Sequence, residues 1–266
     1  MDIKKIVSEF LRFIQRFGLM RGVYLFLRIK LISQNNIKLP GIPHPFSLRK
    51  GTSDFDTFYQ AIIHNQYKFN YGIKPEVIID GGANIGLVSI VFKEMFPDAK
   101  IIAVEPDKEN FEQLKKNVAP YKDIHTIQAG LWFEKSFLKI SDKYKAGKWG
   151  MVTEKVKEES SDTIKAITIK QIMDDFSLGK IDILKLDIET SERELFSTGY
   201  EDWLPKTKVL IVELHDFMSK GTSKPFFKAI NATFENYSFF QLGENTIIIN
   251  EDRIAEKWQS IPGKVF

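Results

Sequence analysis

The sequence contains no cysteine, and this absence removes several kinds of chemistry at once. A chain without cysteine has no disulfide, no thiolate nucleophile, no iron–sulfur cluster and no cysteine-ligated zinc. A large excess of charge is also missing, because 38 Lys and Arg nearly balance 35 Asp and Glu, for a net charge of +3. The composition therefore does not indicate nucleic acid as a partner.

Long uncharged apolar runs are missing as well. Residues 1–32 are rich in apolar side chains, but basic residues interrupt every stretch. A spanning helix needs about 18–20 uncharged residues, and a signal peptide needs an uninterrupted apolar stretch before a small-residue cleavage site. We therefore expect a cytoplasmic protein without a spanning segment.

Residues 1–45 are expected to form an α-helical extension that precedes the main domain, residues 46–266. Apolar residues recur at helical spacing between positions 3 and 17, and a second apolar-basic segment covers 23–32. Turn-forming residues at 35–45 indicate a linker. This basic amphipathic surface could dock peripherally on the inner face of an anionic membrane, form a homo-oligomer interface, or pack on its own catalytic domain.

From residue 77 onward, short β-branched runs alternate with helical ones. We expect the strands at 77–80, 101–104, 125–129, 183–187, 209–214, 237–242 and 246–250, and the helices near 87–95, 108–118, 169–176, 192–197 and 224–234. This alternation predicts an α/β fold with a mainly parallel sheet and helices on both faces. Only residues 243–245 separate the last two strands, so the final strand should run antiparallel. The charged segment 136–165 has no clear pattern and is assigned no structure.

The first strand of this domain ends in a glycine-rich turn with the sequence D-G-G-A-N-I-G. In parallel sheets, ligands sit beyond the carboxyl ends of the strands, where glycines permit close approach and positive φ. A dinucleotide fingerprint would have glycine where Ala83 stands. Asp80 would repel a diphosphate but suits a ligand that carries an ammonium group, such as S-adenosylmethionine. Glu105 ends the next strand and can accept hydrogen bonds from a ribose diol.

A second set of polar residues lies about 25 positions before the first strand. Arg49, Thr52, Ser53 and Asp54 could contact the methionine carboxylate or help close the pocket with Tyr67, or Ser53 or Asp54 could simply begin a helix. The residues assigned to cofactor binding are Asp80, Gly81, Gly82, Ala83, Asn84, Gly86, Glu105, Ser53 and Asp54.

Over roughly residues 45–250, the sequence resembles the FkbM family of class I methyltransferases. The resemblance is carried, in order, by L-R-K-G-T-S-D at 48–54, the turn followed by A-V-E-P, D-I-L-K-L-D-I-E at 182–189, and V-E-L-H at 212–215. It implies a Rossmann-like seven-stranded sheet and, usually, O-methylation of a sugar or polyketide hydroxyl. The chain departs from the family in two places: Thr190 and Ser191 stand where a glycine is usual, and the third strand ends at 129–130 without an acid for the adenine amine.

The catalytic candidates follow the fourth and fifth strands. The fourth strand ends at Asp187, which Glu189 follows, and alternation brings His215 to the same edge with Glu213. A hydroxyl acceptor needs a general base, and we predict His215 in that role, then Glu189. No metal ligand is assigned, although these residues could form an oxygen- and nitrogen-rich metal site, and the strand-end acids could instead cap the next helix.

The function expected is S-adenosylmethionine-dependent O-methylation of a hydroxyl on a glycan, glycolipid or polyketide-type acceptor. Thr190 suggests an alternative, a catalytically silent cofactor-binding or scaffold protein. A second alternative is an NAD(P)-dependent oxidoreductase, against which Asp80 and Ala83 argue. Trp132, Trp149 and Gly150 could line an acceptor pocket, although core packing is the preferred interpretation for Trp132.

Overall fold

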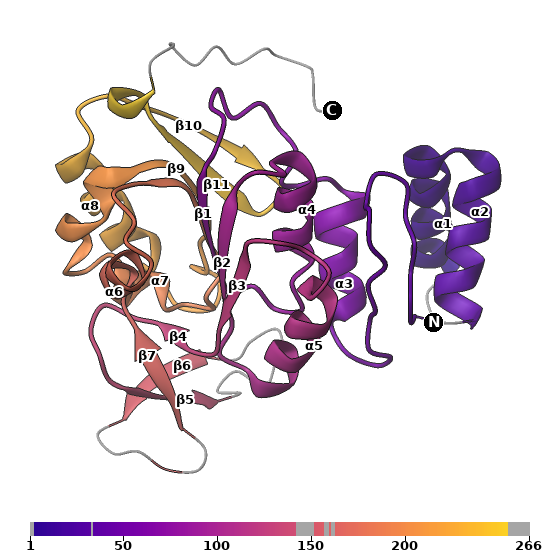
Figure 1. The fold of residues 1–266 in the computed structure, drawn as a ribbon, viewed down its shortest axis with the longest axis horizontal. Helices are drawn as coiled ribbons and strands as arrows, with labels where there is room; N and C mark the ends of the chain where they lie inside the picture. Colours follow the sequence, from indigo (N-terminus) through magenta and orange to yellow (C-terminus); the bar gives the residue numbers. More distant parts are fainter. Residues whose placement is uncertain (1–2, 33, 142–151, 157–159, 161–162, 255–266) are drawn as a thin grey trace.

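The fold is built on a seven-stranded sheet (Figure 1). The computed structural model describes residues 3–32, 34–141, 152–156, 160 and 163–254. The sheet contains β1 (Val77–Gly81), β2 (Lys100–Val104), β3 (Ile124–Ile127), β8 (Ile181–Leu186), β9 (Thr207–Glu213), β10 (Tyr237–Leu242) and β11 (Asn245–Asn250). Their order is β10-β11-β9-β8-β1-β2-β3, and only β11 runs antiparallel to its neighbours. The expected Rossmann-like, mainly parallel sheet is confirmed.

The chain reverses its direction of travel across the sheet between β1 and β8. It proceeds outward from β1 through β2 to β3, and then returns to place β8 on the other side of β1. Ligands in open α/β sheets bind at such a switch point, beyond the carboxyl ends of the strands. The D-G-G-A-N-I-G turn and Asp187 both follow strands that end there.

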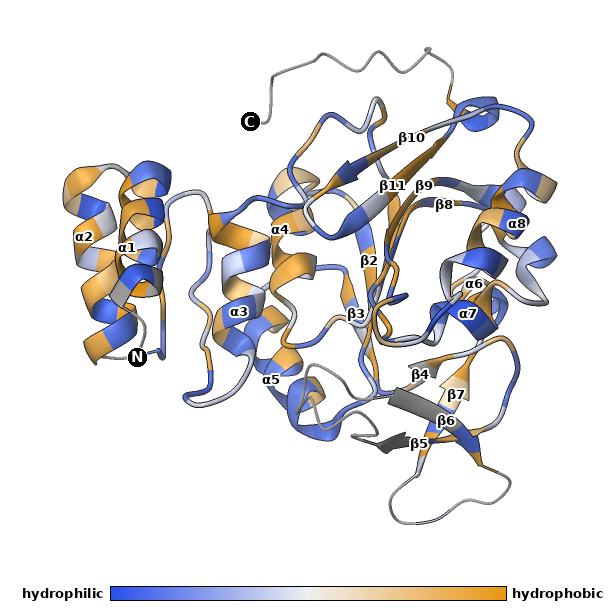
Figure 2. Ribbon diagram, turned by 180° about the vertical axis from the view of Figure 1, so that it is seen from behind, coloured by the Kyte–Doolittle hydropathy of each residue, from blue (hydrophilic) through white to orange (hydrophobic). Residues whose placement is uncertain are grey.

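Alternating side chains of the strands enter two separate cores, one on each face of the sheet. Ile78 packs with α4 (Leu87–Met95) and α5 (Lys108–Val118). Ile79 packs on the opposite face, which is covered by α6 (Ile169–Asp175), α7 (Glu192–Leu195) and α8 (Ser223–Thr233). Because both faces are covered, the strands are apolar along most of their length, as all-buried parallel strands are, and Figure 2 shows this in β8 and β9. Between residues 163 and 254, which the structure describes without a gap, the chain also forms three short 3₁₀ turns, η4 (Tyr200–Asp202), η5 (Leu204–Lys206) and η6 (Glu251–Arg253).

The segment that received no predicted structure contributes to a second, four-stranded sheet. Its strands are β4 (Gly130–Leu131), β5 (Phe137–Ser141), β6 (Val152–Val156) and β7 (Thr163–Ile167), in the order β4-β7-β5-β6. The strand expected to reach residue 129 ends at Ile127, because Gly130 and Leu131 pair with β7 instead. Trp132 is buried against Leu138, as the core-packing interpretation expected. Trp149 and Gly150 lie outside the described residues.

The N-terminal extension forms two helices, α1 (Ile3–Phe17) and α2 (Leu19–Leu27), followed by a π-helical turn, η1 (Arg28–Ile32). It lies beyond α3 (Asp54–Phe58) and the π-helical turn η2 (Tyr59–Ile63) (Figure 1). Phe13 is fully buried and its ring lies 6.0 Å from that of Phe58, and Arg16 Nε donates to the Ile62 carbonyl at 3.1 Å.

The extension therefore packs on the main domain of its own chain and shares its hydrophobic core. The division near residue 45 stays a prediction. No helix among the described residues is long and apolar enough to cross a membrane.

Candidate active site

The glycine-rich turn brings the ends of β1 and β8 into direct contact. Gly82 has φ of 71°, and a Cβ atom there would lie 1.8 Å from the backbone oxygen of Asp187. Its amide and that of Ala83 both donate to the Val104 carbonyl at 3.0 Å. A side chain at position 82 would push these strand ends apart, so the close approach requires glycine.

The other two glycines of the turn serve packing. A Cβ at Gly86 would meet Leu114 at 2.6 Å, and one at Gly81 would meet Leu131 at 2.3 Å. Gly86 also has φ of 85°, where the chain enters α4. Neither residue lines a pocket described below, and both act by holding the turn close to α5 and β4.

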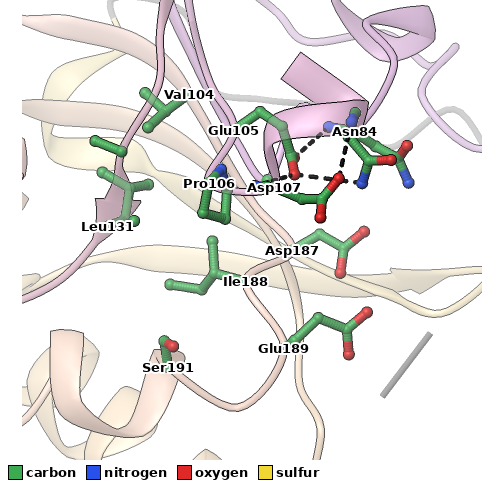
Figure 3. Close-up of a pocket in the computed structure, with 14 residues that line it drawn as sticks. Asn84, Val104, Glu105, Pro106, Asp107, Leu131, Asp187, Ile188, Glu189 and Ser191 are labelled. Carbon is green, nitrogen blue, oxygen red and sulfur yellow. Dashed lines mark hydrogen bonds between the residues drawn. The ribbon is translucent and has the colours of Figure 1, made fainter. Parts of the chain in front are cut away.

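A pocket lies at the switch point, and we call it the sheet-edge pocket (Figure 3). Its polar wall includes Gly82, Asn84, Glu105, Asp187, Glu189 and Ser191. Its apolar wall is made by Val104, Pro106, Leu131 and Ile188. The Oδ1 atom of Asn84 and the Oγ atom of Ser191 are buried without a hydrogen-bond partner. The pocket thus offers an apolar slot beside unused polar atoms.

Glu105 is the best-satisfied acid of this pocket. Its carboxylate accepts from the Asn84 amide at 2.8 Å, the Asp107 amide at 3.0 Å and the Asn110 side chain at 3.3 Å. Burial raises the pKa of Glu105 to about 7, although these hydrogen bonds favour the ionised form. These three contacts fix the orientation of a carboxylate that faces the pocket.

Asp54 stands behind this acid rather than in the pocket. It is fully buried, and Arg49 binds both of its carboxylate oxygens, through Nη2 at 2.6 Å and Nε at 3.0 Å. The same Nη2 donates to Asn110 at 2.6 Å, which completes a chain from Asp54 to Glu105. Helix α3 begins at Asp54, but no side chain caps it.

A smaller cavity on the other side of the turn is lined by Ser53, Ala83 and Tyr67, together with Lys185. Asp187 and Glu189 line this cavity too. The structure thus brings Ser53 and Tyr67 close to the turn, as expected, whereas the Asp54 carboxylate is bound to Arg49.

Asp80 lies beneath the turn and lines none of these cavities. It is fully buried, accepts from Ser89 Oγ at 2.6 Å, and lies 3.3 Å from Lys185 Nζ. Lys185 also donates to the Gly82 carbonyl at 2.7 Å. Burial disfavours the charge of Lys185, but Asp80 and Asp187 outweigh it and raise its pKa.

Lys185 was not among the residues predicted for the site, although a single lysine inside the apolar run of β8 could have indicated it. In this structure Asp80 and Lys185 together hold the turn from below. A direct contact between Asp80 and a cofactor ammonium stays a prediction.

His215 lies in a cluster of carboxylates at the ends of β8 and β9. The imidazole is 2% exposed, and its Nδ1 lies 3.2 Å from Oε1 of the fully buried Glu192. Its Nε2 faces Glu189 at 3.5 Å, Asp187 at 3.7 Å and Glu213 at 3.7 Å. We call these five residues the acid–histidine cluster. The structure therefore unites the three predicted catalytic residues, and neither Asp187 nor Glu189 caps α7.

The charges of this cluster change the pKa of His215, the predicted base. Burial lowers the pKa of His215, but Glu192, Asp187 and Glu189 outweigh burial and raise it to about 10. Burial and the charge of Asp187 raise the pKa of both Glu189 and Glu213. An imidazole that holds a proton on each nitrogen cannot accept another. The carboxylates of the cluster are further candidates for the acceptor of a proton, and the assignment to His215 stays a prediction.

A groove of about 890 Å³ opens on the far side of this cluster. Its walls come from the acid–histidine cluster, from η2 and from α1, which contributes Glu9 and Arg12. Asp187 and Glu189 line the sheet-edge pocket as well as the groove. These two carboxylates therefore form the boundary between two adjoining binding spaces.

The sequence profile described as "Methyltransferase FkbM domain" matches residues 80–240. The chain belongs to this family. The match begins at the first acid of the glycine-rich turn and spans the sheet-edge pocket and the acid–histidine cluster. S-adenosylmethionine is the cofactor of the family.

Two curated relatives carry methyltransferase names. The chain is 27% identical over 168 residues to methyltransferase sdnD of Sordaria araneosa, with 51% of this chain and 65% of that protein covered. It is 26% identical over 150 residues to the hexuronic acid methyltransferase AglP of Haloferax volcanii, with 53% and 57% covered. The chain thus spans less than two thirds of the length of either relative. An FkbM methyltransferase structure from Methylobacillus flagellatus is 14% identical with a TM-score of 0.47, over 93% of this chain and 60% of that one.

The sheet-edge pocket of this FkbM chain fits S-adenosylmethionine. Gly82 leaves room where any Cβ would clash, Glu105 presents a buried carboxylate suited to a ribose diol, and Asn84 offers an unused buried oxygen. Leu131 and Ile188 add an apolar surface suited to the faces of an adenine ring. The nicotinamide alternative finds no support in the family match.

The departure from the FkbM pattern after Glu189 has a conformational basis. Thr190 has φ of 76° and Glu189 has φ of 53°, both in the left-handed region. Glycine adopts this conformation without steric cost, whereas a β-branched residue is an outlier there. The chain keeps the backbone that the glycine of the family permits, and it does so with a strained residue.

Proposed function

We propose that this FkbM protein transfers the methyl group of S-adenosylmethionine to a sugar hydroxyl of a glycan, glycolipid or polyketide-type acceptor. The main support for this proposal is that Asp187 and Glu189 line both the sheet-edge pocket and the groove. When bound, S-adenosylmethionine supplies an electrophilic methyl group on a sulfonium. The pocket residues orient the cofactor and the groove residues orient the acceptor, and positioning of this kind supplies much of the rate of a displacement.

The chemistry of the groove supports a hydroxyl acceptor. Polar side chains that can bond to hydroxyls include Gln60, Gln66 and Asp56, and the aromatic rings of Tyr59 and Phe217 offer flat apolar faces. The carboxylates that line the groove can receive the proton that a hydroxyl loses. The relative AglP is named a hexuronic acid methyltransferase, which supports a sugar as the acceptor class.

Calorimetry with S-adenosylhomocysteine tests the cofactor part of this proposal. Micromolar binding is expected, and an absence of binding at high micromolar ligand contradicts it. The acceptor part is tested with methyl-labelled S-adenosylmethionine and a panel of neutral and hexuronic-acid glycans. A methyl ether is expected, and it resists mild base. Label that mild base releases comes from a methyl ester. A methyl ester or label on an amine contradicts the proposal.

The alternative of a catalytically silent scaffold is separated by loss-of-function variants. If the protein is an enzyme, Glu189→Ala abolishes methyl transfer while S-adenosylhomocysteine binding and thermal melting persist. His215→Ala is the second variant of this test. If no glycan, glycolipid or polyketide-type acceptor is labelled by the unaltered chain although the cofactor binds, the scaffold alternative is favoured.

We also propose that the outer surface of α2 and η1 docks on an anionic membrane, where lipid-linked acceptors are found. Large apolar side chains gather there, and the most exposed are Met20, Leu31, Ile32 and Leu19, at 86%, 77%, 77% and 67%. The exposed Arg21 lies beside Met20 in sequence and supplies charge opposite to acidic headgroups. Because α1 packs on α3 and η2, α2 lies on the side of the extension away from these elements (Figure 1).

Co-sedimentation with vesicles tests the docking surface. Binding to vesicles that contain acidic lipids is expected, and it should be lost in the Met20→Glu/Leu31→Glu double variant. Phe239→Glu, at an exposed apolar residue on β10, is the matched control. Equal binding to neutral vesicles, or a concentration-dependent dimer without vesicle binding, contradicts membrane docking.

A further inference from the structure

The acid–histidine cluster has the geometry of a metal centre as well as that of a proton acceptor. Asp187, Glu213 and His215 each offer one ligand atom, and these three atoms all lie within 4.8 Å of one another. The residues lie at or just beyond the ends of two neighbouring parallel strands, β8 and β9. We propose that they bind one divalent cation of the Mn²⁺ or Mg²⁺ class, at the boundary between the sheet-edge pocket and the groove.

The first argument is the orientation of the buried histidine. Its Nδ1 faces Oε1 of Glu192, an acid with no exposed surface, and the same oxygen accepts from the Ile188 amide at 2.9 Å. Metal-binding histidines usually donate their second ring nitrogen to a carboxylate in this way, which fixes the tautomer. The Nε2 atom is then left as the ligand, and among the described residues no hydrogen bond reaches it.

The second argument is the spacing of the atoms that face Nε2. Carboxylate oxygens of Glu189, Asp187 and Glu213 lie 3.5–3.7 Å from it, which is longer than a charge-assisted hydrogen bond of about 2.7–2.9 Å. Ligands about 2.0–2.2 Å from a shared ion are themselves roughly 3–3.6 Å apart. The cluster is therefore too open for direct hydrogen bonding and nearly the right size for an ion.

Negative charge in the cluster exceeds what one imidazole can balance, because four carboxylates surround His215. Glu189 Oε2 is buried without a hydrogen-bond partner. The nearest lysine, Lys185, lies 3.9 Å from Asp187, but it is already bonded to the Gly82 carbonyl and faces Asp80. Buried carboxylates that lack donors are costly unless a cation neutralises them. A divalent ion supplies that charge and replaces the proton on Nε2, as ligand binding of a metal requires.

The position of the ion gives it a role in the reaction. The part it plays in methyl transfer rests on the proposed function, whereas its binding does not. An acceptor hydroxyl that contacts the ion loses its proton more readily, and that proton passes to the Glu189 carboxylate. The hydroxyl oxygen forms the new bond to the methyl carbon, and the electron pair of the broken carbon–sulfur bond stays on sulfur, which becomes a neutral thioether.

A titration of the unaltered chain with Mn²⁺ tests the site. Electron paramagnetic resonance measures the Mn²⁺ that stays free, and calorimetry measures the binding. One Mn²⁺ per chain is expected. Asp187→Asn and Glu213→Gln, which preserve side-chain shape, should each weaken binding by more than about 100-fold, and Glu192→Gln by roughly 10- to 100-fold. Asp56→Asn removes an exposed acid that lines the same groove outside the cluster and should leave binding unchanged. Mn²⁺ should also raise the melting temperature of the unaltered protein but not of Asp187→Asn.

The proposal is overturned if millimolar Mn²⁺ does not bind, or if Asp187→Asn and Glu213→Gln bind it as tightly as the unaltered chain. S-adenosylhomocysteine calorimetry in EDTA separates this failure from that of the proposed function. If the chain binds the cofactor and transfers methyl groups, and Mn²⁺ affects neither, the proposed metal site is contradicted. The proposed methyltransferase function then stands. If the chain binds Mn²⁺ but not the cofactor, the metal site stands and the proposed methyltransferase function is contradicted.

Discussion

Glu105 and His215 are both buried ionisable groups at the same edge of the sheet, but their surroundings are opposite. Glu105 accepts three hydrogen bonds from its neighbours. The Nε2 atom of His215 faces three carboxylates and makes no hydrogen bond with them. A satisfied carboxylate stays in place and can receive further donors from a neutral group such as a ribose diol. An unsatisfied, acid-rich cluster attracts a cation instead, so the two sites at one sheet edge are prepared for different ligands.

Gly82→Ala should have the largest effect, because this residue lies where the two sites meet. Its Cβ would overlap the Asp187 backbone oxygen, at 1.8 Å, in a left-handed conformation. We expect the free energy of unfolding to fall by at least about 3 kcal/mol, and S-adenosylhomocysteine binding to be lost. Urea denaturation and calorimetry measure both. Gly179→Ala is the control, since a Cβ there meets nothing within 4 Å. Equal stability of the two variants contradicts the close contact between β1 and β8.

Glu105→Gln should separate the two sites. In glutamine an NH₂ group replaces one carboxylate oxygen, and this group cannot accept from the donors that it faces. S-adenosylhomocysteine affinity should therefore fall roughly 30- to 100-fold, or about 2–3 kcal/mol. Mn²⁺ affinity should not change, because the acid–histidine cluster does not contact Glu105. Glu109→Gln, at an exposed acid in the first turn of α5, is the matched control. A parallel loss of Mn²⁺ binding means that the sites are not independent.

The pH dependence of cofactor binding should report the same carboxylate. Burial raises the pKa of Glu105 to about 7 in the free protein, and hydrogen bonds from a ribose diol favour its ionised form. Binding then releases a proton below pH 7, so S-adenosylhomocysteine affinity should be constant above pH 8 and about tenfold lower at pH 6. Calorimetry in buffers of different ionisation enthalpy measures the proton release. A flat profile between pH 6 and 8 contradicts the ionised ribose acceptor.

The contribution of Glu105 to stability has the opposite sign. Its folded pKa lies above the ordinary value of 4.5, so the folded chain binds more protons than the unfolded chain between about pH 4.5 and 7. This group alone therefore lowers the free energy of unfolding as pH rises through that window. Glu105→Gln removes that slope, which a comparison of urea denaturation at pH 5 and pH 7 detects.

Local patterns were sufficient to predict the strands of the seven-stranded sheet, the helices that cover it and the residues at its edge. The predicted helices near 87–95 and 108–118 match α4 and α5, because their apolar spacing and their flanking turns agree with the fold. His215 was found from alternation along β9, which also places Glu213 on the same face. Sequence periodicity specifies which side of an element a residue occupies, and that was enough to find these residues.

Contacts between distant parts of the chain could not be predicted in this way. Asp80 and Lys185 are 105 positions apart, and their pairing depends on β1 lying beside β8. Asp54 was assigned to the cofactor, but it binds Arg49, which also donates to Asn110, 61 positions further along the chain. The second sheet was missed because its strands pair mainly with one another and carry a charged, weakly patterned sequence.

Thr190→Gly should have the smallest effect, and it tests whether the boundary between pocket and groove is strained. At φ of 76°, an L-residue costs roughly 1–2 kcal/mol relative to glycine, part of which the greater freedom of glycine in the unfolded chain offsets. We expect a net gain of about 1 kcal/mol in the free energy of unfolding and a melting temperature about 2–4 °C higher. Asp123→Gly is the matched control, because Asp123 also has positive φ, at 58°, but aspartate tolerates it and should gain little. If both variants gain equally, position 190 holds no special strain. If Thr190→Gly is stabilised but weakens Mn²⁺ binding, the strain helps to hold Glu189 against the cluster.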